Sequence, residues 1–287
     1  MAFLDIDGLT YSSLARLPKN ADRCYQYILT RLLLGIASVS KGTTICRQST
    51  DYSIVPQNVQ ARKPTDAFKE FLTTYGIGGT VQGFVRKTIA DNREFYADLL
   101  GEFSNFFIQT ERKSHTSAFV FLYRILERLS YCTPLLYSST QSDYRGTFND
   151  LKALFASDNK GELGLFKVFL NNGRFIDQLK LDVPYLIDFS LAYFHKDSFF
   201  DLTVARYREW VSNDKNTHQL EIKFRHIPEL LQTVRNRFFH FRVGDGQPNI
   251  RLAEMPDSDE YFSCLNPSFC SCMAVIVLHT LARKYQT

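Results

Sequence analysis

Apolar residues recur at three- and four-residue spacing through almost the whole chain from Pro64 onward. This spacing puts apolar side chains on one side of an α-helix, and such helices bury that side by packing against one another. No internal repeat or low-complexity tract interrupts the pattern. The chain is therefore expected to be mainly α, a helical bundle with additional helices over residues 61–287.

The same periodicity indicates where each helix should lie. The expected helices are Asp22–Val39, Thr65–Tyr75, Thr80–Asp91, Arg93–Thr110, Ser114–Tyr131, Tyr144–Ala156, Glu162–Leu179, Pro184–Phe194, Val204–Asn213, Pro228–Phe241 and Phe269–Tyr285. Residues 1–60 form a separate N-terminal region in this interpretation, small and irregular. It should contain a short strand at Ala2–Ile6, a turn at Asp7-Gly8 and a polar loop over 41–60.

Composition excludes several classes of protein. The 287 residues are 45% hydrophobic and include 25 Phe and 15 Tyr, enough for a core filled with aromatic rings. The start, MAFLDIDGLTYSS, lacks the basic and apolar regions of a secretory signal, and no run approaches the roughly 18 apolar residues of a membrane span. We therefore expect a cytoplasmic protein without membrane association, whose six cysteines stay reduced.

Positive charge is unevenly distributed along the chain. The net charge of +4 is too small to identify a nucleic-acid binder by itself. Between Lys223 and Arg251, however, six basic residues face only two acidic ones, and Arg237 and Arg242 belong to this stretch. Charge alone leaves two interpretations open, a solvated helix face and a surface for phosphates.

The helix expected at Pro228–Phe241 has both ends marked in the sequence. Pro228 suits the first helical position, Glu229 suits the positive end of the helix dipole, and Gly244 suits a C-cap. At about 100° per residue, one side of the helix is apolar and should face the core: Leu230, Leu231, Val234, Phe238 and Phe241. The opposite side carries Arg235, Asn236, Phe239 and His240.

These outward polar residues suit the cleavage of RNA without a metal. That reaction needs a base for the ribose 2′-hydroxyl, an acid for the leaving 5′-oxygen and a cation for the charge developing on phosphorus. The imidazole of His240 can act as acid or base near neutral pH, and the guanidinium of Arg235 is a permanent phosphate clamp. One helix supplies a single set of groups, whereas two copies facing across a two-fold axis supply two sets and pair their outward Phe239 rings.

The segment running from Arg235 through Asn236 to His240 resembles a known signature, the Arg-(four to six residues)-His pattern of the HEPN superfamily, in which Asn commonly follows the Arg. An upstream helix, AFVFLYRILERLSY, strengthens the resemblance, because its Glu127 matches a polar position on an earlier HEPN helix. The resemblance covers residues 114–285. HEPN proteins are helical bundles, usually dimeric, and the active ones are metal-independent ribonucleases of toxin–antitoxin, abortive-infection and CRISPR-linked defence.

The resemblance implies a role for each residue of the pattern. Arg235 and His240 would be catalytic, Asn236 would support them and Glu127 would be an accessory group. Arg237 and Arg242 would bind RNA, and Phe239 would lie in the interface of a homodimer. The expected activity is an endoribonuclease that leaves a 2′,3′-cyclic phosphate, uses no metal or cofactor, and is restrained or triggered by a regulatory, sensor or antitoxin protein. A helical module that binds RNA or protein without cleaving is the alternative.

A second resemblance competes with the first. The segment Phe3-Leu4-Asp5-Ile6-Asp7-Gly8 looks like the nucleophile motif of haloacid-dehalogenase-type phosphatases, and Asp245 with Lys223 loosely matches the rest of that site. Those enzymes need a parallel sheet whose strands alternate with helices. Too few β-branched runs lie between Pro64 and Phe241 to build one.

Two further patterns are assigned to structure. Cys264, Cys270, Cys272 and His279 could be combined into a zinc site, but the cysteines lie in the apolar run FCSCMAVIVL and are expected in the core. The glycine-rich stretch 76–79 lacks the Lys-Ser/Thr that a phosphate-binding P-loop needs, so a turn is expected there.

Overall fold

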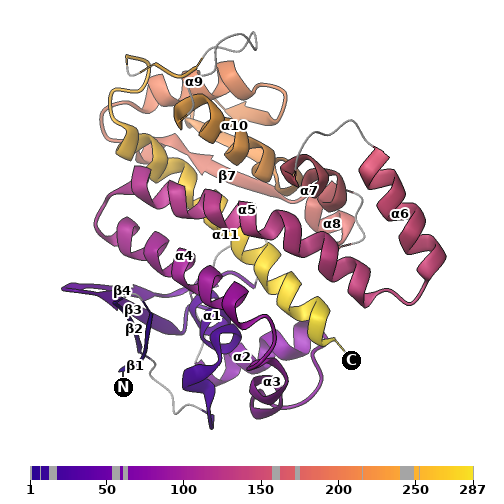
Figure 1. Cartoon of the computed structure of the whole chain (residues 1–287). Coiled ribbons are helices and arrows are strands. Elements are labelled where there is room, and N and C mark those ends of the chain that lie inside the picture. The colour runs from indigo at the N-terminus through magenta and orange to yellow at the C-terminus, as the bar shows by residue number, and fades with distance from the viewer. Residues whose placement is uncertain are drawn as a thin grey trace.

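The computed structural model shows a mainly α-helical protein with small antiparallel sheets (Figure 1). It describes residues 2–6, 8–12, 18–53, 59–60, 64–156, 162–171, 175–214, 216–239, 249–251 and 253–286. The mainly α fold expected from the periodicity is confirmed. The division at residue 60 stays a prediction, and one hydrophobic core contains residues from both sides of it, for example Tyr11 and Phe103.

Three long helices form the centre of the molecule. They are α4 (Arg93–Glu111), α5 (His115–Thr140) and α11 (Ser258–Tyr285), and α5 packs against both of the others (Figure 1). Helix α11 is long and apolar enough to cross a membrane, but 89% of its most apolar 18-residue window is buried inside the protein. It therefore has the surroundings of a core helix.

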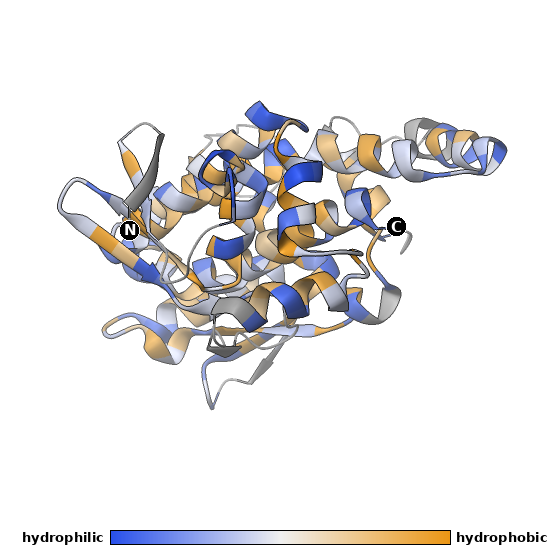
Figure 2. Ribbon diagram, turned by 90° about the horizontal axis from the view of Figure 1, so that it is seen from below, coloured by the Kyte–Doolittle hydropathy of each residue, from blue (hydrophilic) through white to orange (hydrophobic). Residues whose placement is uncertain are grey.

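The remaining helices surround this centre. They are α1 (Tyr25–Leu33), α2 (Pro64–Thr74), α3 (Val81–Thr88), α6 (Tyr144–Ala156), α7 (Glu162–Asn171), α8 (Gln178–Leu181), α9 (Lys196–Tyr207) and α10 (Ile227–Phe239), with short 3-10 turns at Ala21–Arg23, Phe189–Leu191 and Phe224–His226. Helices α7 and α10 pack on α5, while α6 extends beyond the rest of the molecule (Figure 2). Helix α6 therefore lies at the edge of the fold.

The strands form small antiparallel sheets. The first is β1 (Ala2–Ile6), β2 (Leu9–Ser12), β3 (Ala37–Lys41) and β4 (Thr44–Gln48), in that order, and it packs on α4. A second pairs β5 (Thr50–Asp51) with β6 (Val59–Gln60). The third has the order β7 (Pro184–Asp188), β9 (Gln219–Lys223), β8 (Val211–Asp214). The strand expected at Ala2–Ile6 is confirmed, but the N-terminal region is a regular sheet rather than irregular chain.

The helix expected at Asp22–Val39 is wrong in its second half. The helix ends after Leu33, and residues from Ala37 onward form β3. Gly35 separates the two elements with a φ of +70°. A Cβ on Gly35 would lie 2.6 Å from the backbone carbon of Ser49, so only glycine lets the two chain segments approach this closely.

The polar loop expected over 41–60 is also wrong. A turn at Gly42, with φ of +59°, returns the chain into β4, and Lys41 pairs with Thr44. Turn-forming residues therefore mark only the tip of a hairpin here, because the Thr and Ile that follow can pair with β3.

Two helices expected in the later part of the chain are replaced by strands. Residues 184–188 of the expected helix Pro184–Phe194 form β7, in which buried Tyr185 and Ile187 alternate with exposed Leu186. The expected helix Val204–Asn213 starts inside α9, which ends at Tyr207, and finishes in β8. Pairing with β9 stabilises both strands, and this long-range contact is not visible in local spacing.

Candidate functional site

A small pocket lies between α5 and α10, the two helices that carry the expected site residues. Its volume is about 270 Å³. The lining residues are Phe119, Val120, Tyr123, Arg124 and Glu127 from α5, and Arg235 and Phe239 from α10. Three of the expected site residues, Glu127, Arg235 and Phe239, therefore line the same cavity, although 108 positions separate Glu127 from Arg235 in the sequence.

Helix α10 presents Arg235 to this pocket because its apolar side is fully buried. Leu230, Leu231 and Val234 have no exposed surface, which fixes the rotation of the helix about its axis. At the start of the helix, Lys167 Nζ of α7 lies 2.9 Å from Glu229 Oε1. Glu229 lies in the first turn of α10, where its negative charge interacts favourably with the positive end of the helix dipole.

The guanidinium of Arg235 lies over the ring of Tyr123, with Cζ 4.5 Å from the ring centroid. Its Nη1 donates a hydrogen bond to Asn236 Oδ1 at 3.1 Å. A cation on an aromatic face gains roughly 0.5–2 kcal/mol, and the planar guanidinium keeps its other donors available. Arg235 is therefore held in place from two sides while it still borders the cavity.

Tyr123 connects Arg235 to Glu127. Burial raises the pKa of the Tyr123 hydroxyl, and the charge of Glu127 and its hydrogen bond with the tyrosine raise that pKa further, while Arg235 lowers it. The hydroxyl therefore keeps its proton, and it can donate a hydrogen bond to the Glu127 carboxylate. Arginine, tyrosine and glutamate form a connected polar set along one wall of the pocket.

Aromatic rings form another wall. Phe239 at the end of α10 stacks parallel to Phe119, with ring centroids 5.8 Å apart and an interplanar angle of 3°. Phe119 is fully buried, whereas Phe239 is 41% exposed. The outward position expected for Phe239 is thus observed, and its place in a dimer interface stays a prediction.

Sequence reasoning missed two polar residues of the pocket, Tyr123 and Arg124. Arg124 Nη2 lies 2.8 Å from Glu102 Oε1 of α4, and its side chain is 50% exposed, so it adds a second cation to the rim. Burial raises the pKa of Glu102, which the positive charges of Arg124 and Arg128 oppose. The available signal was spacing, because Tyr123 precedes Glu127 by one helical turn and must share its face.

Arg237, expected to bind RNA, points away from the pocket. It is only 9% exposed, its guanidinium lies 5.1 Å from the ring centroid of Tyr207, and Nη1 donates to the Arg206 carbonyl at 3.3 Å. Tyr207 in turn stacks on Trp210, with centroids 6.1 Å apart. This position gives Arg237 a packing role behind α10, and its contact with RNA stays a prediction that the geometry does not favour.

The remaining residues of the expected site lie beside the pocket or outside the described residues. Asn236 is half-buried and bonded to Arg235, beside the pocket rather than in its lining. His240 and Arg242 lie outside the described residues, as does Gly244, the expected C-cap. Within the described chain, helix α10 ends at Phe239.

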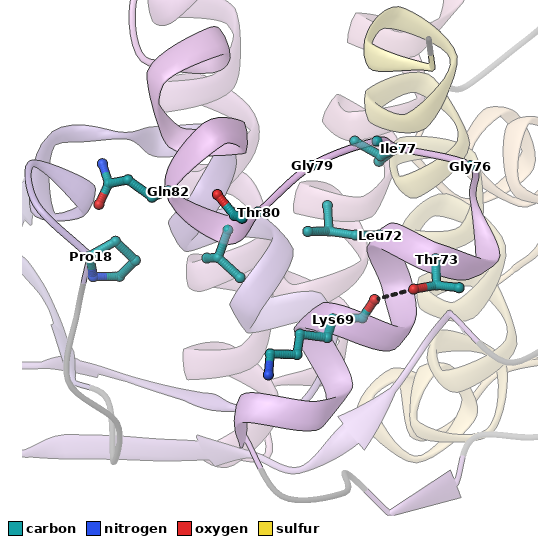
Figure 3. Close-up of a pocket in the computed structure, with 11 residues that line it drawn as sticks. Pro18, Lys69, Leu72, Thr73, Gly76, Ile77, Gly79, Thr80 and Gln82 are labelled. Carbon is teal, nitrogen blue, oxygen red and sulfur yellow. Dashed lines mark hydrogen bonds between the residues drawn. The ribbon is translucent and has the colours of Figure 1, made fainter.

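A larger cavity of about 820 Å³ lies elsewhere, between α2, α3 and Pro18 (Figure 3). The glycine-rich stretch 76–79 forms the expected turn at its edge. Two polar residues here complete the local structure: Thr80 accepts from the Gly83 N–H at 3.1 Å, and Gln82 bonds the backbone of Lys19. None of the residues expected to act on RNA lines this cavity.

The cysteine cluster considered for zinc lies in the core, as expected. Burial raises the pKa of Cys264 to about 11 and that of Cys270 to about 12, and it raises that of Cys272 as well. Burial and the nearby Lys180 lower the pKa of His279 to about 3. Protonated thiols are poor metal ligands, and no cluster of three or more His, Cys, Asp or Glu side chains suited to a metal occurs among the described residues.

The strand that carries Asp5 does not have the surroundings of a phosphatase nucleophile. Strand β1 pairs antiparallel with β2, and Asp5 lies opposite Thr10. Every strand pair within the described part of the chain is antiparallel. The parallel sheet that the haloacid-dehalogenase interpretation requires is therefore not found there.

Comparison with known proteins identifies no relative: no family model, no curated protein and no solved structure matches the chain.

Proposed function

We propose that this protein is a metal-independent endoribonuclease of the HEPN type, with Arg235 and His240 as catalytic residues. The observation that supports the proposal is that Arg235 of α10 and Glu127 of α5, which the HEPN resemblance assigns to one site, line the same pocket. A role in antiviral defence or as a toxin follows from the resemblance alone.

In the proposed reaction, each polar group has one task. The Arg235 guanidinium binds the scissile phosphate and stabilises the charge that develops on it. His240 transfers a proton to or from the ribose or the leaving oxygen. Asn236 and Tyr123 hold the guanidinium, and Glu127 orients Tyr123 through their hydrogen bond. The ribose 2′-oxygen attacks phosphorus, the 5′-oxygen leaves with a proton, and a 2′,3′-cyclic phosphate remains.

One chain offers a single histidine to this chemistry, yet the reaction needs both an acid and a base. Two copies related by a two-fold axis would supply both from two His240 side chains. We therefore propose that the active enzyme is a homodimer.

The experiment that tests the proposal is incubation of the full chain with RNA in the presence of EDTA. We expect cleavage to persist in EDTA and to yield 2′,3′-cyclic phosphate ends. His240→Ala should lower the rate by about 10²- to 10⁴-fold, the range of a lost general acid or base, and Arg235→Ala should lower it about 100-fold or more.

Arg208→Ala is the matched control, because Arg208 is an exposed arginine on the turn after α9 and outside the pocket. The Arg208→Ala variant should cleave RNA at the wild-type rate. Cleavage that needs a divalent metal, or that survives His240→Ala, would contradict the proposal. RNA binding without any cleavage would favour the binding module instead.

A further inference from the structure

The cavity between α2 and α3 has no task in the proposed nuclease, and its walls are mainly apolar (Figure 3). Its volume of about 820 Å³ lies within the range of about 300–1,000 Å³ that is typical of small-molecule sites. It shares no residue with the pocket between α5 and α10. The apolar surface comes from Pro18, Leu72, Ile77 and Val81, with the methylene stem of Lys69.

Helix α2 turns one side to the core and a neighbouring side to this cavity. Phe68 and Phe71 lie on the core side, where they are 2% and 1% exposed. Lys69, Leu72 and Thr73 are three and four positions apart, so they share a different side of the helix, and all three line the cavity (Figure 3). The packing of the two phenylalanines therefore fixes the direction in which this wall faces.

Contacts within the protein also hold the other walls in place. The ring of Phe84 on α3 lies 5.5 Å from that of Phe68, centroid to centroid, and joins α3 to α2. Gln82 accepts a hydrogen bond from the Lys19 N–H at 3.1 Å and donates one to the Lys19 carbonyl at 3.3 Å. This double contact holds the adjacent Pro18 beside α3. A ligand that enters a cavity with walls already fixed has little protein to order.

Lysine side chains supply the charge at this cavity. No carboxylate lines it, and the exposed Lys69 forms no ion pair within the described part of the chain. The hydroxyls of Thr73 and Thr80 already bond the backbone of their own helices. Lys19, exposed next to the cavity, adds a second positive charge nearby. The cavity thus combines apolar walls with a cation at its edge.

We propose that this cavity binds a medium-chain fatty acid in its anionic form, with the acyl chain against Leu72, Ile77 and Val81 and the carboxylate at Lys69. Apolar walls with a cation at the edge complement a molecule that has an apolar body and one negative end. A single ammonium at the edge balances a single negative charge, which favours a carboxylate over a doubly charged phosphate. The binding is non-covalent, and it is independent of the proposed nuclease.

Isothermal titration calorimetry of the full chain with decanoate tests the proposal. We expect one decanoate per chain, with a Kd of about 0.1 mM. The heat capacity change should be negative, because apolar surface is buried. Octanoate should bind about tenfold more weakly, since each of its two missing methylenes contributes roughly three- to fourfold. Decyltrimethylammonium, with the opposite charge, should bind at least about tenfold more weakly than decanoate.

A pair of lysine variants locates the carboxylate. Lys69→Gln removes the cation and should raise the Kd of decanoate about fivefold. Lys87→Gln is the matched control, because Lys87 is an exposed lysine on α3 that does not line the cavity. The Lys87→Gln variant should bind decanoate as the wild type does.

Val81→Asp locates the acyl chain. The variant places a negative charge in the apolar wall and should abolish measurable binding of decanoate. Val81 is the first residue of α3, where the helix dipole favours an acidic side chain, so we expect the fold to be retained. Circular dichroism and thermal unfolding check the fold of the variant.

Four outcomes would each overturn the proposal: no saturable binding of decanoate, several molecules bound per chain, equal binding of decyltrimethylammonium, or unchanged binding by folded Val81→Asp. The comparison of Lys69→Gln with Lys87→Gln changes only exposed side chains, so it decides the question even where Val81→Asp does not fold. Equal affinities of these two variants would likewise reject the site. RNA cleavage enters none of these measurements, so the two proposals fail separately.

Discussion

Helices α5 and α11 cross in the middle of the molecule and are similar in length, yet they present their residues differently. On α11, 20 of the 28 residues are buried, including three cysteines. On α5, one side is buried, while the other carries Arg124, Glu127 and Arg128 toward solvent. The first helix thus holds its potentially reactive groups inside the core, and the second presents charged groups at a pocket.

The difference teaches that residue type alone does not locate chemistry. Cys270 and His279 on α11 can react or bind metals in other surroundings, but burial keeps the thiol protonated and the imidazole neutral. Tyr123 on α5 lies at the boundary between core and solvent, where it touches a cation and a carboxylate. The residues of the candidate site are therefore distinguished from those of the core by their location at the boundary between core and solvent.

The largest expected effect tests the structural character of α11. Phe269 is fully buried and contacts Phe119, with ring centroids 5.9 Å apart. Phe269→Ala should lower the free energy of unfolding by about 3–5 kcal/mol, since it removes a buried ring and leaves a cavity. Urea denaturation measures this loss, and a change below 1 kcal/mol would contradict the assignment of α11 to the core.

A smaller effect concerns the acid sensitivity of α11. The folded pKa of His279 is about 3, below the value of about 6.5 in an unfolded chain. Below pH 6.5 the unfolded chain therefore binds a proton that the folded protein does not. Above pH 6.5, His279 does not reduce the free energy of unfolding. As the pH drops from 6.5 toward 3, the protonation of His279 in the unfolded chain lowers that free energy by up to about 1.4 kcal/mol per pH unit.

The measurement is the unfolding free energy of wild type and His279→Gln between pH 7 and pH 4. The difference between the two curves isolates His279, because the other titrating groups are shared. The variant should lose less stability on acidification. Parallel curves would mean that His279 titrates as it does in the unfolded chain.

The smallest effect is expected on α5. Glu127 is exposed, so Glu127→Gln should change the unfolding free energy by no more than about 0.5 kcal/mol. Its effect should appear only in RNA cleavage, through the lost orientation of Tyr123. A stability loss above 1 kcal/mol in the same urea experiment would give Glu127 a structural role and weaken the contrast with α11.

Local spacing predicted much of the helical framework and little of the sheets. The helix at Tyr144–Ala156 was predicted with the observed bounds, and α4 ends at Glu111, one residue beyond the prediction. Strand β7, in contrast, was read as a helix, because five residues with two buried apolar positions fit either period. Its pairing with β9 lies more than 30 residues away in sequence.

The pocket was predicted in part for a similar reason. Periodicity within α10 correctly turned Arg235 away from the core, and the resemblance supplied Glu127. The same periodicity predicted that Phe238 lies in the core, but this residue is only partly buried. The periodicity also did not predict that Arg237 packs inward on Tyr207. The direction that a long side chain takes depends on the helices packed against it. The sequence of one helix does not show which helices those are.

The stack of Tyr207 on Trp210 has an optical consequence. The chain contains one tryptophan, so its indole emission has a single source, next to the tyrosine that supports Arg237 behind α10. Any event that loosens the back of this helix changes the surroundings of that indole. Intrinsic fluorescence can therefore follow α10 in real time, in the unlabelled protein.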